Sequence, residues 1–251
     1  MCCEIRLGGT ARSPEDVIAL HKLGLEFAEI PIKDETNFLA FKDDYQALGR
    51  QLGLFYLCHG PQEGNPHDVK ALKNEYLPKL MQILSFMPEL DMKLLTLHLW
   101  LDPRFVSQEV IAFKIDLLKK ITERAMGAGI TICVENLSEN ATQMARPFEA
   151  LPYLNLTLDV GHAQLLTSEN TSIEFIAKYP QRIKHVHLHD NRGGNSPEGD
   201  LHLPIGEGIV DFRGILDQLK TIGYHRTMTL ELKPSEISRC LANVNQLLAT
   251  C

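Results

Sequence analysis

The chain has 251 residues, of which 44% are hydrophobic and 23% are charged, a composition that is ordinary for a globular protein. Thirty-two acidic and 25 basic residues give a formal net charge of −7, so the chain has no general basic field to hold nucleic acid, although a local site could still do so. No apolar run reaches the ~18 residues that a membrane-spanning helix needs, so we expect no contact with a membrane.

The sequence predicts a cytoplasmic protein with reduced cysteines. Residues 1–6 lack a basic segment followed by an apolar stretch, so a secretory signal is not expected. The six cysteines form no C-x-x-C pair and no regular framework, and in a chain of this size without a signal we expect free thiols. They are Cys2, Cys3, Cys58, Cys133, Cys240 and Cys251.

Eight short apolar runs of strand length alternate with longer helical patterns. Strands that alternate with helices indicate a parallel sheet. Eight such units in about 250 residues predict an α/β fold, a single (β/α)8 TIM barrel over residues 1–251, with no linker dividing the chain. The predicted strands are Glu4–Gly8, Leu25–Pro31, Leu54–His59, Leu94–Leu99, Ile130–Asn136, Leu154–Val160, Ile183–His189 and Met228–Leu232.

Helical patterns fill most of the gaps between these strands. Ser13, followed by a proline and two acidic residues, predicts a helix for which Ser13 is the N-cap. Val106–Met126 and Ile237–Leu248 each carry apolar residues on one face at helical spacing. The link between the fifth and sixth strands is short, so a full helix is not expected there.

The last five predicted strands each have one aliphatic face and one partly polar face. In the fifth strand, for example, Ile132 and Val134 point away from Cys133 and Glu135. We expect the aliphatic faces to pack under the outer helices and the mixed faces to look into the barrel.

The inward face of six consecutive strands, the third to the eighth, ends in a metal-ligand residue type. Taken singly, a histidine there is often a hydrogen-bonded structural residue, and an acid is often a helix cap or turn former. Six such residues at one rim of a barrel are difficult to explain by structural hydrogen bonds, caps and turns alone. A divalent cation would offset the cost of burying these groups and the repulsion among them. The six are His59, His98, Glu135, Asp159, His187 and Glu231, and metal binding is predicted for at least the last four.

Two further segments extend this group of ligand types. His162 follows the sixth strand closely enough to turn back over the rim, and Asp200 and His202 lie in the loop after the seventh strand. That loop could instead be simply solvated, and its first part, Asn191–Gly199, could be a lid. Carboxylate and imidazole ligands favour zinc, manganese or cobalt over calcium or copper.

Other charged residues near the predicted rim have two interpretations each. Arg192 and Lys233 could bind a phosphate or sugar oxygen of the substrate, or could be ordinary surface charges. Glu29 could orient substrate or form a structural ion pair. His185, one inward step below the rim, is expected in the core or in support of a ligand, and Asp190 in support of a ligand or in a turn.

Several segments resemble the xylose-isomerase-like barrel superfamily, which contains sugar isomerases and epimerases and also endonuclease IV. The C-terminal two-thirds match well, and the N-terminal third matches mainly through strand order and two strand ends. The matching segments are Cys133–Asn136, Leu158–Ala163, His185–Asn191, Asp200–Gly208, Cys58–Pro61 and Leu97–Leu99.

For the sugar isomerase and epimerase branch, the resemblance implies one divalent metal ion held by Glu135, Asp159, His187 and Glu231. The two glutamates would exchange a proton with the substrate carbon, and His162 would position substrate oxygens. One M²⁺ among three carboxylates leaves a site charge near −1, which suits a neutral sugar.

For the endonuclease IV branch, the resemblance implies three zinc ions and a phosphodiesterase acting on abasic DNA. Three M²⁺ with four carboxylates leave a charge of about +2, which suits a phosphodiester. The chain is short for that branch, and its DNA-penetrating loops are not recognised. The nine matching ligand positions are His59, His98, Glu135, Asp159, His162, His187, Asp200, His202 and Glu231.

The preferred prediction is therefore a metal-dependent isomerase or epimerase of a sugar or sugar phosphate, with Glu135 and Glu231 as catalytic residues. The alternatives are the endonuclease IV-like enzyme, which alone would require nucleic acid as a partner, and a non-catalytic metal-bearing barrel that binds a ligand. Other metal-dependent chemistry, such as dehydration of an inositol-like ring, also stays open. The sequence makes no prediction of the oligomeric state.

Overall fold

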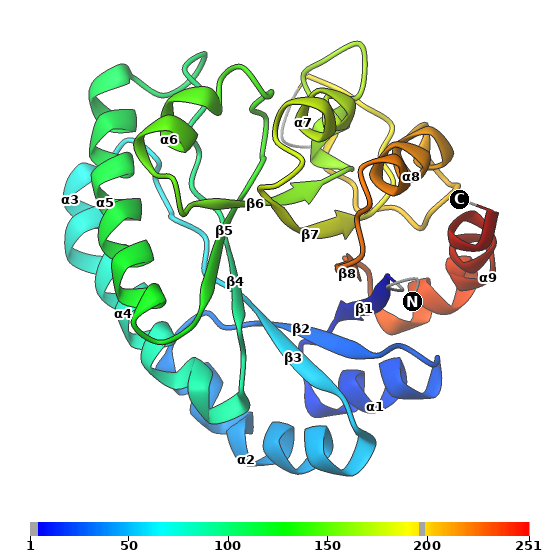
Figure 1. Cartoon of the computed structure of the whole chain (residues 1–251). Coiled ribbons are helices and arrows are strands. Elements are labelled where there is room, and N and C mark those ends of the chain that lie inside the picture. Colours follow the sequence, from blue (N-terminus) through cyan, green and yellow to red (C-terminus); the bar gives the residue numbers. More distant parts are fainter. Residues whose placement is uncertain (1–4, 196–198, 251) are drawn as a thin grey trace.

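The computed structural model describes residues 5–195 and 199–250, and it confirms the predicted barrel. Eight parallel strands close into a ring in chain order, and the helices lie outside them (Figure 1). The strands are β1 (Arg6–Thr10), β2 (Phe27–Pro31), β3 (Phe55–His59), β4 (Leu94–Leu97), β5 (Thr131–Glu135), β6 (Asn155–Asp159), β7 (Ile183–Leu188) and β8 (Thr227–Leu230).

The outer helices begin largely where the capping residues predict. The Ser13 side chain accepts a hydrogen bond from the Asp16 amide at 3.3 Å, and Ser107 caps the long helix α5 in the same way. No helix within the described ranges is long and apolar enough to cross a membrane. The helices are α1 (Pro14–Lys22), α2 (Glu35–Leu52), α3 (Val69–Ala71), α4 (Leu77–Phe86), α5 (Gln108–Met126), α6 (Ala145–Ala150), α7 (Ser172–Lys178), α8 (Phe212–Thr221) and α9 (Pro234–Thr250), with short helical turns η1 (Leu72–Tyr76), η2 (Met87–Leu90) and η3 (His162–Gln164).

The first strand lies two residues later than predicted, and Glu4 falls outside the described residues. Two of the five residues of β1 are glycines, a residue that usually weakens a strand. In the structure, a Cβ on Gly8 would lie 2.5 Å from the Phe27 ring, and one on Gly9 would lie 2.7 Å from the Leu20 side chain. These glycines therefore allow β1 to pack closely against its neighbours. The other strand ends differ from the predictions by two residues or fewer.

The barrel interior changes from apolar to polar toward the C-terminal ends of the strands. Toward the N-terminal ends of the strands, the barrel interior is filled by a buried apolar cluster of Phe27, Leu57, Leu94 and Cys133. One inward step further along β4, the Thr96 hydroxyl lies 2.8 Å from that of Thr157. Inward positions beyond this level carry the ionisable residues. The aliphatic faces of the strands, as predicted, lie in the core beneath the helices.

Candidate active site and metal centre

Four predicted metal ligands face one another at the C-terminal ends of β5, β6, β7 and β8. One ligand atom from each of Glu135, Asp159, His187 and Glu231 lies within 4.8 Å of all the others. Nδ1 of His187 is 3.4 Å from Glu135 and 3.3 Å from Glu231. Three of the residues are buried, and the Glu231 side chain is 11% exposed. The strand ends thus bring three carboxylates and one imidazole to a single point.

Two buried atoms of this group lack a hydrogen-bond partner within the described part of the chain: Nδ1 of His187 and Oε1 of Glu135. Oε1 of Glu135 is 3.1 Å from Nδ1 of His162, but that contact lacks hydrogen-bond geometry. A buried polar atom without a partner costs about 1–3 kcal/mol, and more where the group is charged. Carboxylate and imidazole ligands suit zinc, manganese and cobalt, so this donor set fits a divalent cation.

The ionisation of these groups indicates a strongly negative local potential. Burial alone would lower the pKa of His187, but Glu231, Glu29 and Glu135 hold it well above its usual value. Burial acts in the same direction on His59, yet Glu135 and Glu231 raise the pKa of His59 to about 9. For Glu135, burial would raise the pKa, and the surrounding imidazoles hold it well below its usual range. The Glu135 carboxylate is therefore kept ionised, and the site attracts positive charge.

Glu29 forms the ion pair that was one of its two predicted roles. Both of its carboxylate oxygens lie 3.1 Å from Nε2 of His187, and Oε2 lies 2.9 Å from Nε2 of His185. The Thr229 hydroxyl donates to the same Oε2 at 2.6 Å. Glu29 and its neighbours fix the ring of His187 so that Nδ1 faces the other carboxylates.

His59 and His98 lie against Glu135 on one side of the four-residue group. Nε2 of His98 is 3.0 Å from Oε2 of Glu135, and Nε2 of His59 is 3.4 Å from the same atom. The His59 nitrogen is also 3.8 Å from Glu231. The structure thus brings these two predicted residues to the same carboxylate.

On the other side, His162, Asp200 and His202 meet. Oδ2 of Asp200 is 3.3 Å from Nε2 of each histidine. His189, which was not predicted as a ligand, joins them: its ring stacks on His202 with centroids 3.8 Å apart, and its Nε2 is 3.0 Å from Asp159. The alternation of histidines along β7 places it on the inward face and could have identified it.

The loop after β7 is held by Asp190, in agreement with its predicted place in a turn. Its carboxylate accepts backbone N–H groups of Gly206 and Gly208, at 2.9 and 2.8 Å, and of Val210 at 3.2 Å. The predicted lid Asn191–Gly199 is described only in part, because residues 196–198 lie outside the described residues.

Arg192 and Lys233 are both exposed, and neither is among the residues that line the adjacent cavity. Their predicted substrate-binding role therefore remains a prediction, with the surface-charge alternative still open.

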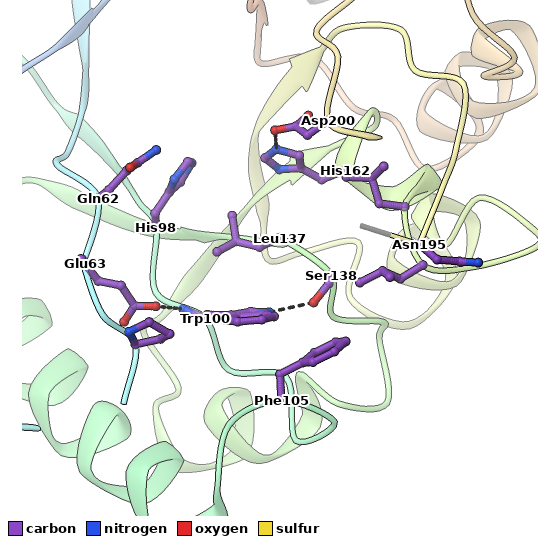
Figure 2. Close-up of a pocket in the computed structure, with 14 residues that line it drawn as sticks. Gln62, Glu63, His98, Trp100, Phe105, Leu137, Ser138, His162, Asn195 and Asp200 are labelled. Atoms are coloured by element: carbon purple, nitrogen blue, oxygen red, sulfur yellow. Dashed lines mark hydrogen bonds and ion pairs between the residues drawn. The ribbon is translucent and has the colours of Figure 1, made fainter. Parts of the chain in front are cut away.

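A cavity of about 450 Å³ adjoins the ligand residues at His98, His162 and Asp200 (Figure 2). One wall is aromatic, since the rings of Trp100 and Phe105 stack with centroids 4.9 Å apart. A volume of this order is typical of sites for small molecules. The lining residues are Gln62, Glu63, Gly64, Pro66, His98, Trp100, Phe105, Leu137, Ser138, His162, Leu165, Leu166, Asn195 and Asp200.

Trp100 is fixed by contacts on three sides. Its indole N–H donates to Ser138 Oγ at 2.7 Å, and its backbone N–H donates to Glu63 at 2.7 Å (Figure 2). The fully buried Lys114 donates to the Trp100 carbonyl at 2.8 Å and pairs with Glu63 at 2.7 Å. This wall could not be predicted from the sequence, because the residues that form it come from separate segments of the chain. The one indication of it was a tryptophan just after the fourth predicted strand.

The cavity wall carries no free cation within the described part of the chain. No lysine or arginine is among its lining residues. Nearby, Lys114 is engaged by Glu63, and the guanidinium of Arg104 lies 2.6 Å from the buried Asp102. The described wall therefore offers imidazoles, neutral polar groups, two carboxylates and an apolar aromatic face.

A family model described as xylose isomerase-like TIM barrel matches residues 17–246 of the chain. The chain belongs to this family. The resemblance of the sequence motifs to the superfamily is thereby confirmed.

Proteins with similar sequences extend over all or part of the barrel. An uncharacterized protein of Methanocaldococcus jannaschii is 25% identical over 248 residues, 95% of each chain. An inosose dehydratase of Serratia proteamaculans is 27% identical over 148 residues, which cover 51% of this chain and 48% of that protein.

Solved structures show the same fold over nearly the whole chain. A D-tagatose 3-epimerase-like protein superposes with a TM-score of 0.83 at 23% identity, covering 98% of both chains. The IolI protein, solved with a zinc atom, superposes with a TM-score of 0.79 at 17% identity, covering 98% of this chain and 99% of that one. At these identities the likeness establishes the barrel and its strand order.

Proposed function

We propose that this protein is a divalent-metal-dependent isomerase or epimerase acting on an unphosphorylated sugar. One observation carries the proposal: Glu135, Asp159, His187 and Glu231 converge next to His98 and His162, which line a small cavity, and two of their buried atoms have no hydrogen-bond partner among the described residues. The family assignment supports it, as does the fold shared with a D-tagatose 3-epimerase-like protein.

The four residues would hold the ion, which when bound supplies a positive charge that polarises carbonyl and hydroxyl oxygens of the sugar. Glu135 is held ionised by the imidazoles around it, so it can accept a proton from a sugar carbon. Glu231, whose side chain is partly exposed, would take a proton from solvent and donate it to that carbon, and Glu135 would release its proton to solvent. His162 borders the cavity and would hold a sugar hydroxyl.

The cavity supports an uncharged substrate. A phosphate group would find no lysine or arginine among the described lining residues, but would face Glu63 and Asp200. A sugar ring can lay its apolar face on Trp100 and direct its hydroxyls toward Ser138, Gln62 and the histidines. This narrows the predicted range of substrates from sugars and sugar phosphates to free sugars.

Binding and turnover can be tested separately because Trp100 is the single tryptophan of the chain. Free ketoses and aldoses should change its fluorescence, and in D2O with Mn²⁺, Co²⁺ or Zn²⁺ a substrate should exchange a carbon-bound proton for deuterium. Glu135→Gln should keep the fluorescence change and lose the exchange, and Glu231→Gln should keep the fluorescence change and lose conversion of the substrate into product. Binding without exchange or any other reaction in the wild type would instead favour the non-catalytic barrel, and loss of water from a cyclic polyol would favour a dehydratase.

A second candidate, an endonuclease IV-like phosphodiesterase, is favoured by one observation. The additional predicted ligands gather on both sides of the central four, with His59 and His98 on Glu135 and with Asp200 between His162 and His202. Elemental analysis distinguishes the candidates: about one metal ion per chain agrees with the isomerase, and about three zinc ions with cleavage of abasic-site DNA agree with the phosphodiesterase.

A further inference from the structure

The barrel has a second cavity at the end opposite the metal centre. It measures about 420 Å³ and opens among the N-terminal ends of β1, β3, β4, β5, β7 and β8. Leu57 and Leu94, which belong to the buried apolar cluster of the barrel, form part of its floor. The lining residues are Arg6, Phe55, Leu57, Lys93, Leu94, Thr131, Lys184, His225, Arg226 and Thr227.

This N-terminal mouth collects positive charge in a chain whose net charge is −7. Arg6, Lys93, Lys184 and Arg226 all line it, together with His225. None of the described residues that line it is acidic. These five side chains come from the starts of four strands, β1, β4, β7 and β8, or from the turns before them, so closure of the barrel brings them together.

Most of this positive charge has no carboxylate partner. Lys93 is paired with Asp91 at 2.6 Å, but within the described ranges no carboxylate lies within 4.0 Å of Arg6, Lys184 or Arg226. The Arg6 guanidinium lies over the Phe55 ring, 4.5 Å from its centroid. The Lys184 ammonium donates to the Gln181 carbonyl at 2.7 Å, and partial burial and the charge of Arg226 both lower the pKa of Lys184.

We propose that the N-terminal mouth binds a small anion that carries two phosphate groups. Unpaired cations that face one another are stabilised by a shared counter-ion, and guanidinium groups bind phosphate oxygens with directed hydrogen bonds. The volume fits a small molecule rather than a polymer segment. Three cations without carboxylate partners in the described part of the chain match two phosphates better than a monovalent anion. This site is separate from the metal centre and does not depend on the proposed reaction.

Propane-1,3-diyl bisphosphate is a suitable probe because it lacks the hydroxyls of a sugar. Isothermal titration of the metal-loaded protein at low ionic strength should give one saturable site per chain, with affinity that falls as salt is added. Lys184→Gln/Arg226→Gln should weaken binding about tenfold or more through loss of charge-assisted hydrogen bonds. The matched control Lys73→Gln/Lys79→Gln removes the same charge from exposed positions on η1 and α4 and should bind like the wild type.

Three results would overturn the proposal. The first is the absence of saturable binding, and the second is equal weakening of binding in both double variants. The third is undiminished binding by Lys184→Gln/Arg226→Gln, because the bisphosphate would then bind at the metal centre. Should the double variant unfold, Arg226→Gln alone, at an exposed side chain, must still weaken binding relative to Lys73→Gln. The melting temperature of each variant without the probe shows whether the fold is intact.

Discussion

Glu29 lies directly behind His187, with both carboxylate oxygens 3.1 Å from Nε2, while Nδ1 of the same ring faces Glu135 and Glu231. A carboxylate in this position fixes the orientation of a metal-binding imidazole and raises its basicity. β2 supplies it to a ligand on β7, across the interior of the barrel.

The first prediction is that Glu29→Gln weakens metal binding by about 10- to 100-fold, because the amide cannot reproduce the charge behind the ring. Competition with a chromophoric chelator measures the affinity, and circular dichroism shows whether the fold is retained. Asp43→Asn, at an exposed acid on α2, serves as the charge-matched control. Equal affinities for wild type and Glu29→Gln would remove Glu29 as a positioning residue.

The second prediction concerns removal of the metal. A ligand that binds only the folded chain stabilises it by about 4 kcal/mol at a concentration 1,000 times its dissociation constant. Adding Zn²⁺ or Mn²⁺ to the chelator-treated protein should therefore raise its melting temperature by several degrees. His187→Ala should lose most of that increase, whereas His225→Ala, at an exposed histidine far from the rim, should keep it. The same increase in both variants would contradict the assigned ligand.

The third prediction concerns the buried ion pair behind the cavity wall. Burial lowers the pKa of Lys114 and raises that of Glu63, so each charge depends on the other, 2.7 Å away. Lys114→Met should cost about 3–5 kcal/mol because it leaves Glu63 buried without a cation. Glu63→Gln/Lys114→Met should cost less than the single change. Urea unfolding of the wild type, both single variants and the double variant checks this order, and additive losses would mean that the pair is not coupled.

Most of the barrel could be predicted because its local patterns agree. Alternating faces such as those of β5 identify both the strand and the residue that ends it, Glu135. The short α6 agrees with the short link between β5 and β6. The end of β1 could not be predicted, because the need for Gly8 and Gly9 comes from the ring of Phe27 and the side chain of Leu20 on other elements.

The residues of the candidate site likewise fall into those that the sequence predicts and those that it does not. Residues at strand ends could be predicted, because the fold brings all such positions to one rim. The contact between Lys114 and Glu63 could not, since it depends on how one face of α5 meets a loop from another part of the barrel. The roles of Arg192 and Lys233 could not be decided either, because long exposed side chains are not fixed by strand register.

The fourth prediction tests the unexpected histidine through its neighbour Gly161. A Cβ at Gly161 would collide with the ring of His189, although the backbone there, with φ of −72°, accepts any residue. Gly161→Ala should therefore cost about 1–3 kcal/mol and weaken metal binding, since the ring must move away from Asp159. Gly127→Ala is the matched control, because its Cβ meets only the Arg124 carbonyl at 3.5 Å.

In a His189→Ala background, the same change at Gly161 has no ring to displace and should cost little further stability. Urea unfolding of the two single variants and the double variant measures this coupling. If Gly161→Ala were as costly without the imidazole as with it, the ring would not fill the space over Gly161. His189 would then have no part in holding Asp159 toward the metal ligands.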